Sequence, residues 1–133
     1  MVCGVFEKVA VMVEGGWISL VMCGCIWWWC LARFIDAVGL YIILGFIDVY
    51  CYVGIYFLGV IWPGGEDGNE SVELLMPALR VIDVVDFFDF VFVVARCGGV
   101  VIVCVLPGSA NVIGGEGVIV RIYGAVVDEM VYF

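Results

Sequence analysis

The side chains best suited to chemistry in this sequence are carboxylates and thiols, because the chain contains no histidine. The usual general base near neutral pH and the commonest nitrogen ligand for metals are therefore missing. Ser19, Ser71 and Ser109 have no base partner at a recognisable spacing, and the Gly-x-Ser-x-Gly pattern is absent. We predict no catalytic residues, so the sequence indicates a protein that is not an enzyme.

Asp48 is the most notable single residue, because it is the one charge in the apolar stretch formed by residues 37–62. An ionisable side chain in the middle of a membrane span is a candidate proton site or helix–helix contact. Arg96 is its candidate partner if a later apolar segment also crosses the bilayer. The alternative is an accidental charge that membrane insertion tolerates.

Asp83, Asp86 and Asp89 form a weak acidic cluster, since a helix would place all three on one broad face. Carboxylate oxygens in that arrangement are ligands for Ca²⁺ or Mg²⁺. A solvated acidic first turn, favoured by the helix dipole, explains the same spacing. The sequence therefore predicts no metal site and no cofactor.

The seven cysteines are an odd number, so they cannot all pair within one chain. Cys23 and Cys25, with Cys30 nearby, lack the second pair of ligands that structural zinc sites show. Most cysteines lie in apolar runs, where a free thiol behaves as a small hydrophobic side chain.

Composition then limits the elements that must position these residues. The chain of 133 residues is 66% hydrophobic and 14% charged, whereas ordinary domains are roughly 45–50% apolar and roughly 25% charged. The apolar excess predicts burial in a lipid bilayer, with self-association as a further option. A net charge of −9 excludes the basic face that nucleic acid needs. No small-molecule substrate can be identified from the sequence.

The predicted fold is mainly α, with a transmembrane helical hairpin at about residues 15–33 and 37–62. The predicted organisation is a membrane hairpin in residues 1–62, an acidic hydrophilic loop in 63–80, and a third apolar segment with a tail in 81–133. Residues 81–106 are a candidate third span. Residues 100–106 fit a buried strand equally well, because valine and isoleucine favour strands. The C-terminal tail is β-prone.

Two functions remain open from the sequence. The first is a small integral membrane protein with a structural or interaction role, or a small oligomeric pore-like element that uses Asp48. The alternative is an unselected reading frame from a strand skewed to G and T. Thr, Gln and His are missing, whereas the residues encoded by G and T are abundant. Such a strand specifies an apolar protein without any selection for a membrane.

Overall fold

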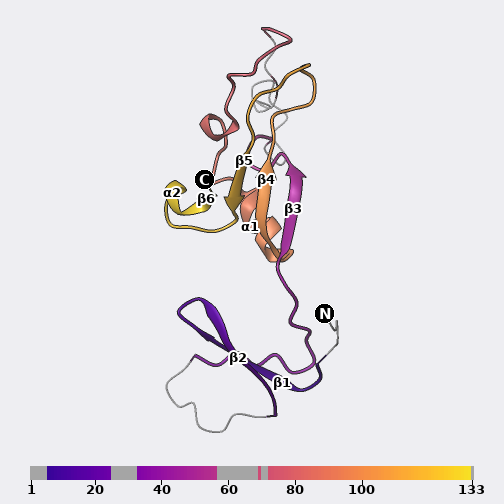
Figure 1. The fold of residues 1–133 in the computed structure, drawn as a ribbon, viewed down its shortest axis with the longest axis vertical. Coiled ribbons are helices and arrows are strands. Elements are labelled where there is room, and N and C mark those ends of the chain that lie inside the picture. Colours follow the sequence, from indigo (N-terminus) through magenta and orange to yellow (C-terminus); the bar gives the residue numbers. More distant parts are fainter. Residues whose placement is uncertain (1–5, 25–32, 57–68, 70–71, 133) are drawn as a thin grey trace. The chain divides into compact units, whose positions relative to one another are not determined.

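The computed structural model describes residues 6–24, 33–56, 69 and 72–132. Its contacts divide the chain into two compact units, Met1–Tyr41 and Ile42–Phe133 (Figure 1). The predicted boundary at residue 62 lies outside the described residues, and both it and the boundary at residue 80 stay predictions.

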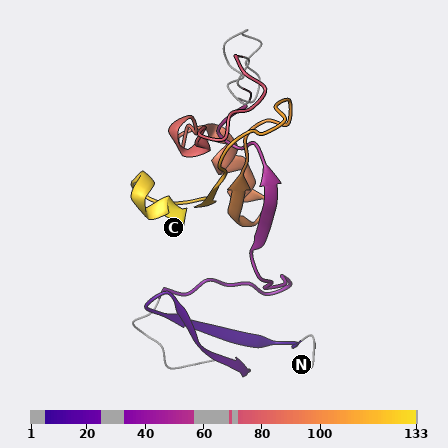
Figure 2. The same ribbon diagram turned by 45° about the horizontal axis from the view of Figure 1, so that its top comes forward.

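The first unit is built on a β-hairpin. Strand β1 (Val9–Glu14) pairs antiparallel with β2 (Trp17–Cys23), as Figure 2 shows. Gly15 and Gly16 connect them with φ of 56° and 83°. A two-residue turn with positive φ at both positions matches the right-handed twist of the flanking strands, and glycine adopts it without strain. Valine, isoleucine and tryptophan in the strands add to the preference for β structure.

The predicted transmembrane hairpin is wrong. The described part of residues 15–33 contains strand β2, and the described part of residues 37–62 contains strand β3 (Phe46–Cys51). Within the described ranges, no helix has both the length and the apolar character needed to cross a bilayer. Trp17, the first residue of β2, is 80% exposed.

The second unit contains a four-stranded sheet in the order β3-β4-β5-β6 (Figure 1). The other strands are β4 (Val100–Val105), β5 (Val118–Arg121) and β6 (Val131–Tyr132). β3 and β4 are parallel, and the two remaining pairings are antiparallel. Residues 100–106 were predicted to be part of either a membrane span or a strand. They contain strand β4, so the second prediction is confirmed.

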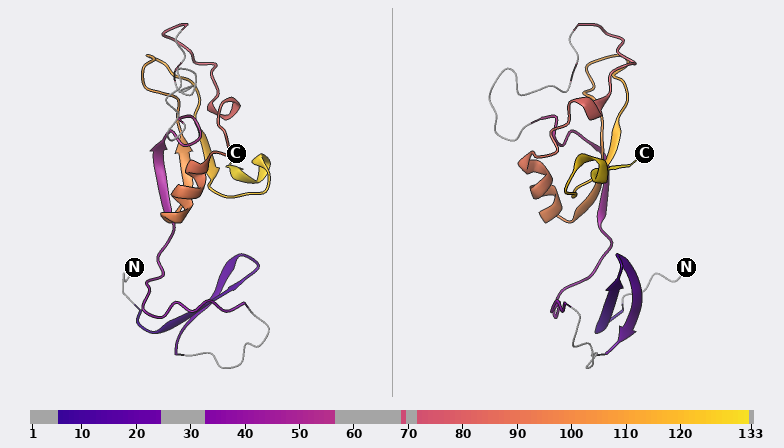
Figure 3. Two further views of the ribbon diagram at one scale, coloured as in Figure 1. Left: turned by 180° about the vertical axis from the view of Figure 1, so that it is seen from behind. Right: turned by 90° about the vertical axis from the view of Figure 1, so that its left-hand side faces the viewer.

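The connection from β3 to β4 contains the short 3-10 helix η1 (Val81–Asp83) and helix α1 (Phe90–Cys97). Helix α1 lies along one face of the sheet (Figure 3). Asp89 is its N-cap, and its carboxylate accepts the Val91 N–H at 3.1 Å. A last, four-residue helix, α2 (Val127–Met130), follows β5.

One hydrophobic core joins the sheet to α1. The buried positions alternate along the strands, as Val103 and Val105 do in β4 and Val118 and Val120 do in β5. Alternate side chains share one face of a strand, so the other face of these two strands is left more exposed. The core residues are Cys51, Ile55, Val81, Val85, Phe92, Val103, Val105, Val118, Val120, Ile122 and Met130.

The prediction of a third span at residues 81–106 is also wrong. These residues form three separate elements, η1, α1 and β4. Helix α1 has only eight residues and ends at Cys97. Gly99 has φ of 86°, in the left-handed region that glycine adopts most easily, and β4 begins at the next residue. An apolar run of this length thus divides into a short helix, a turn and a strand.

Candidate functional site

The carboxyl ends of β3 and β4 meet at one edge of the sheet, because the two strands are parallel. Their arrows point the same way in Figure 1. The Leu106 N–H donates to the Cys51 carbonyl oxygen at 3.1 Å, which holds the two strand ends together. In sheets with parallel strands and crossover helices, ligands bind beyond this edge, on the loops that follow the strands.

Three tyrosines gather at this edge, and we call Tyr50, Tyr52 and Tyr56 the tyrosine cluster. The Tyr50 and Tyr52 hydroxyl oxygens lie 2.5 Å apart in a hydrogen bond. The rings of Tyr50 and Tyr52 are 5.4 Å apart, and those of Tyr52 and Tyr56 are 5.3 Å apart, both edge to face. This geometry is favourable for aromatic pairs and holds the three rings in one row.

Asn69 links the tyrosine cluster to the loop that follows β4. Its amide nitrogen donates to the Tyr56 hydroxyl at 3.0 Å, and its carbonyl oxygen accepts the Ala110 N–H at 3.0 Å. One side chain therefore joins the segments after both parallel strands. Tyr56 accepts from Asn69, so its own proton is available to donate elsewhere.

A hydrogen bond within the cluster favours the neutral form of Tyr50. The hydrogen bond with Tyr52 raises the pKa of Tyr50 above its usual value of 10.0, and a hydrogen bond with Ser109 acts in the opposite direction. Tyr50 is consequently a phenol at neutral pH. Neutral hydroxyl groups held in a fixed row can donate hydrogen bonds to the oxygen of a polarised carbonyl group.

Asp48 lies on β3, two residues before Tyr50, and is exposed. Its Oδ1 accepts the Tyr50 N–H at 3.1 Å. Arg96 is also exposed, in the last turn of α1, and no ion pair joins Asp48 to Arg96 in the described part of the chain. The structure thus places Asp48 beside the tyrosine cluster and places Arg96 elsewhere in the unit.

The three aspartates of the acidic cluster do not share a helix face. Asp83 is in η1, Asp86 accepts the Phe88 N–H at 2.9 Å, and Asp89 caps α1. The residues that the structure describes include no group of three His, Cys, Asp or Glu that could hold a metal ion. Asp86 and Asp89 have local structural contacts instead.

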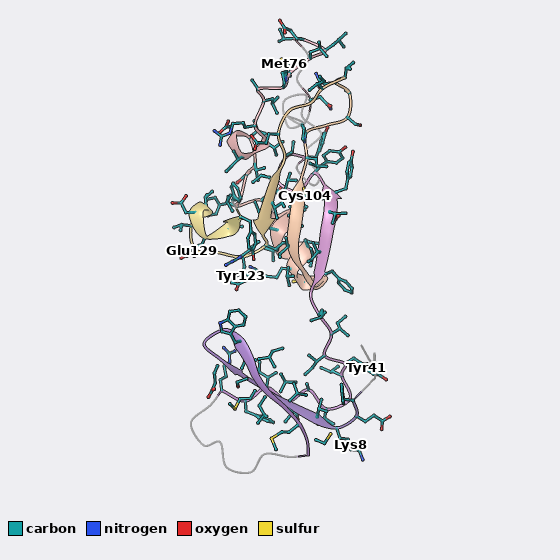
Figure 4. The ribbon with its side chains drawn as sticks, viewed as in Figure 1. Lys8, Tyr41, Met76, Cys104, Tyr123 and Glu129 are labelled. Carbon is teal, nitrogen blue, oxygen red and sulfur yellow. The ribbon has the colours of Figure 1, made fainter. Side chains whose placement is uncertain are left out.

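Cys51 is buried under the strand ends, and its Sγ donates to the Cys104 carbonyl oxygen at 3.5 Å. Cys104, labelled in Figure 4, lies on the neighbouring strand β4. Burial raises the pKa of the Cys51 thiol, and the charge of Asp48 adds to this effect. A neutral, buried thiol is a poor nucleophile. Cys25 and Cys30 lie outside the described residues.

Sequence reasoning missed the tyrosine cluster. The signal was the alternation Tyr50-x-Tyr52 at the end of an apolar run, followed by Tyr56 one turn later. Had residues 46–51 been read as a strand, the rule that ligands bind beyond the carboxyl ends of parallel strands would have pointed to these hydroxyl groups.

Comparison with known proteins gives two likenesses, although no family model matches the chain. "Amidohydrolase tasK" of Hapsidospora irregularis is 35% identical over 86 residues, which are 65% of this chain and 9% of that protein. A crystal structure of an amidohydrolase from Thermotoga maritima MSB8 matches with a TM-score of 0.80 and 28% identity, over 92% of this chain and 31% of that one. The chain thus spans only a minor part of either protein.

These likenesses contradict the predicted non-enzymatic membrane protein. Both similar proteins are named as hydrolases, and the match extends to sequence and fold. An unselected reading frame would have no reason to match them in both respects, so that alternative is wrong as well. The lipid bilayer as partner and the membrane location rested on the predicted spans and fall with them. The interpretation that no small-molecule substrate can be identified is contradicted as well, because the similar solved structure is that of an amidohydrolase.

Proposed function

We propose that this chain is part of an amide-hydrolysing enzyme and that the tyrosine cluster binds the carbonyl group of the substrate. The observation that carries the proposal is the row of tyrosine hydroxyl groups at the shared carboxyl edge of β3 and β4. The names of the two similar proteins supply the reaction class, hydrolysis of an amide.

In the proposed reaction, a water oxygen attacks the carbonyl carbon of the amide. The hydroxyl groups of Tyr52 and Tyr56 donate hydrogen bonds to the carbonyl oxygen as it becomes an oxyanion. The C–N bond then breaks, and the leaving nitrogen takes the proton that the water lost. Donors held in place before the reaction are worth about 10²–10³-fold in rate for each one removed.

Asp48 is the carboxylate that we propose to take the proton from water. Its Oδ1 is held by the Tyr50 N–H, and its Oδ2 has no hydrogen-bond partner among the described residues, so that oxygen can accept. Proton transfer by a positioned side chain contributes typically about 10²–10⁴-fold. Asp48, which the sequence singled out as a proton site within a membrane, would thus serve as a proton acceptor in hydrolysis.

A metal-bound water is the other common source of a nucleophile for hydrolysis. The donor set tests whether a metal fits. The sequence has no histidine, and no cluster of three suitable ligands exists within the described ranges. These residues do not fit a metal ion, so no step is assigned to one.

The test is to assay the purified chain with an aryl amide such as a p-nitroanilide and a cyclic imide such as succinimide. We expect hydrolysis above the buffer rate, and a fall in kcat/KM of roughly 10²-fold for Tyr52→Phe. Asp48→Asn should lower kcat with less effect on KM.

Tyr132→Phe is the matched control. Tyr132 is on β6, where its ring stacks under the Arg121 guanidinium at 4.4 Å, and phenylalanine keeps that ring. Circular dichroism of each variant shows whether the fold is kept. Hydrolysis that is equal in the parent, Tyr52→Phe and Asp48→Asn would overturn the assignment of this site.

A further inference from the structure

A second concave site lies between α1 and the segment that follows β5, away from the tyrosine cluster. It has a volume of about 170 Å³. Tyr123, labelled in Figure 4, lines it from the segment after β5, together with Val126. Phe87 and Phe92 also line it, with ring centroids 6.1 Å apart in a stacked arrangement. The cavity is thus mostly aromatic and aliphatic.

One side of helix α1 forms a polarised wall of this cavity. Asp89, Phe92, Val93 and Arg96 all line it. They are spaced i, i+3, i+4 and i+7, which places them on one face of a helix. The wall therefore has a carboxylate at one end, a guanidinium at the other and apolar side chains between them.

Asp89 has an oxygen that lacks a partner. The side chain is 9% exposed, and its Oδ1 accepts the Val91 N–H. Its Oδ2 is buried with no hydrogen-bond partner in the described part of the chain. Leaving a buried acceptor unsatisfied is unfavourable, and more so when the group is charged. Asp89 also lines the cavity, so a donor bound there can satisfy its carboxylate once the side chain turns toward it.

Arg96 lies about two helical turns, or about 10 Å, along the axis from Asp89. Long side chains on a helix lean back toward its N-terminus, so the guanidinium leans toward the cavity and shortens this separation. Arg96 is exposed and makes no ion pair with the described residues. Its donors are free to bind an anionic group at the mouth.

We propose that this cavity binds a free amino acid with an apolar side chain. The ammonium group would donate to the Asp89 carboxylate, the ligand's carboxylate would bind the Arg96 guanidinium, and the apolar side chain would contact Phe92. The helix dipole places about half a unit charge of opposite sign at each end of α1. The full charges of Asp89 and Arg96 exceed these, so they determine how the bound amino acid is oriented. This inference does not depend on the proposed hydrolysis.

The test is titration of the full chain with L-phenylalanine, followed by calorimetry and by NMR. Phenethylamine, which lacks the carboxylate, and 3-phenylpropionate, which lacks the ammonium group, are the comparison probes. We expect L-phenylalanine to bind at least about tenfold more tightly than either, because each loses one charged hydrogen bond.

Three variants assign the binding to the cavity. Asp89→Asn keeps an oxygen to cap α1 but loses the charge, and Arg96→Gln changes an exposed side chain without disturbing the core. Each should weaken L-phenylalanine binding at least about tenfold. Val126→Trp, at a 54% exposed lining position, should abolish binding by filling the cavity. Asp83→Asn is the control, because Asp83 is exposed and does not line the cavity.

The proposal is overturned if L-phenylalanine shows no saturable binding, or if all three probes bind equally. Equal weakening by Asp83→Asn and Asp89→Asn would also overturn it, since the effect would then reflect net charge. If Asp89→Asn does not fold, Arg96→Gln and Val126→Trp still decide the outcome. Amide hydrolysis can fail while L-phenylalanine binds, so the two proposals are tested separately.

Discussion

Gly108 lies so close to Asn69 that a Cβ atom at position 108 would overlap with the carboxamide of the asparagine. The same carboxamide bonds Tyr56 on one side and the Ala110 backbone on the other. The missing side chain at position 108 therefore makes room for the link between the tyrosine cluster and the loop after β4.

Gly108→Ala should displace Asn69 and loosen the tyrosine cluster. The φ of Gly108 lies outside the left-handed region, so space is the obstacle and backbone strain is not. Overpacking of this kind typically costs about 1–3 kcal/mol. Urea denaturation measures the loss of stability, and near-UV circular dichroism reports the tyrosine environment.

A double-mutant cycle is the control for this prediction. In an Asn69→Ala background the overlapping carboxamide is gone, so adding Gly108→Ala should cost almost nothing further. Additive losses in the double variant would show that Gly108 is needed for another reason.

Gly54→Ala should be among the most damaging single substitutions in the second unit. Gly54 has φ of 77°, and an added Cβ would lie 2.9 Å from the Asp86 carbonyl oxygen and 3.0 Å from the Phe92 ring. A left-handed alanine costs roughly 1–2 kcal/mol, and the overlap adds about 1–3 kcal/mol. Chemical denaturation gives the change in the free energy of unfolding.

Gly99→Ala is the matched comparison. Its φ is 86°, but the nearest atom to an added Cβ is 3.6 Å away on Phe46, an ordinary contact. Gly99→Ala should therefore lower the free energy of unfolding only by the cost of a left-handed alanine, roughly 1–2 kcal/mol. Equal losses at positions 54 and 99 would contradict the tight packing around Gly54.

The stability of the second unit should fall as the pH rises above about 9, partly because of Cys51. Burial raises its pKa above the usual 9.0 in the folded chain. The unfolded chain then loses this proton first, so the folded state binds more protons in that pH range. The contribution of the Cys51 thiol to the free energy of unfolding is fully present below pH 9. It is lost as the pH rises through the raised pKa of the folded state.

Thermal denaturation between pH 7 and pH 10 measures this slope. Cys51→Val removes the thiol and keeps an apolar side chain, so the slope should become smaller by the share due to Cys51. Iodoacetamide at pH 8 should also modify the exposed Cys23 and Cys97 well before Cys51. Modification of all three at similar rates would contradict the burial of Cys51.

Part of the fold could be predicted from the sequence. The run Val100–Val105 has the β-branched composition of a strand, and VIVR in the tail forms β5. Residues 46–51 could not be separated from a helix by hydrophobicity, because so short an apolar run has no clear period; in the structure all of them except Cys51 are exposed. The parallel pairing of β3 with β4 depends on contacts between distant residues, which local patterns do not contain.

The candidate site was predictable only in part. Asp48 was predicted to be a candidate functional residue because it is an isolated charge, and it lies beside the tyrosine cluster. Asn69 gave no signal, because its role depends on the position of Ala110, 41 residues further along the chain. Asp89 was grouped with Asp83 and Asp86 by spacing, whereas its burial next to a cavity depends on how α1 packs against the sheet.

The parallel pairing of β3 with β4 also bears on how the chain reaches its structure. Asp48 aligns with Val103, so more than fifty residues separate these partners along the chain. Closing so long a loop costs entropy before any pairing contact repays it, which slows folding. In the hairpin of the first unit, Glu14 pairs with Trp17 across two residues, and such turns close in about 1–10 μs. The apolar strands β3 and β4 therefore stay exposed longest during synthesis, and this is the interval in which the chain is most prone to aggregate.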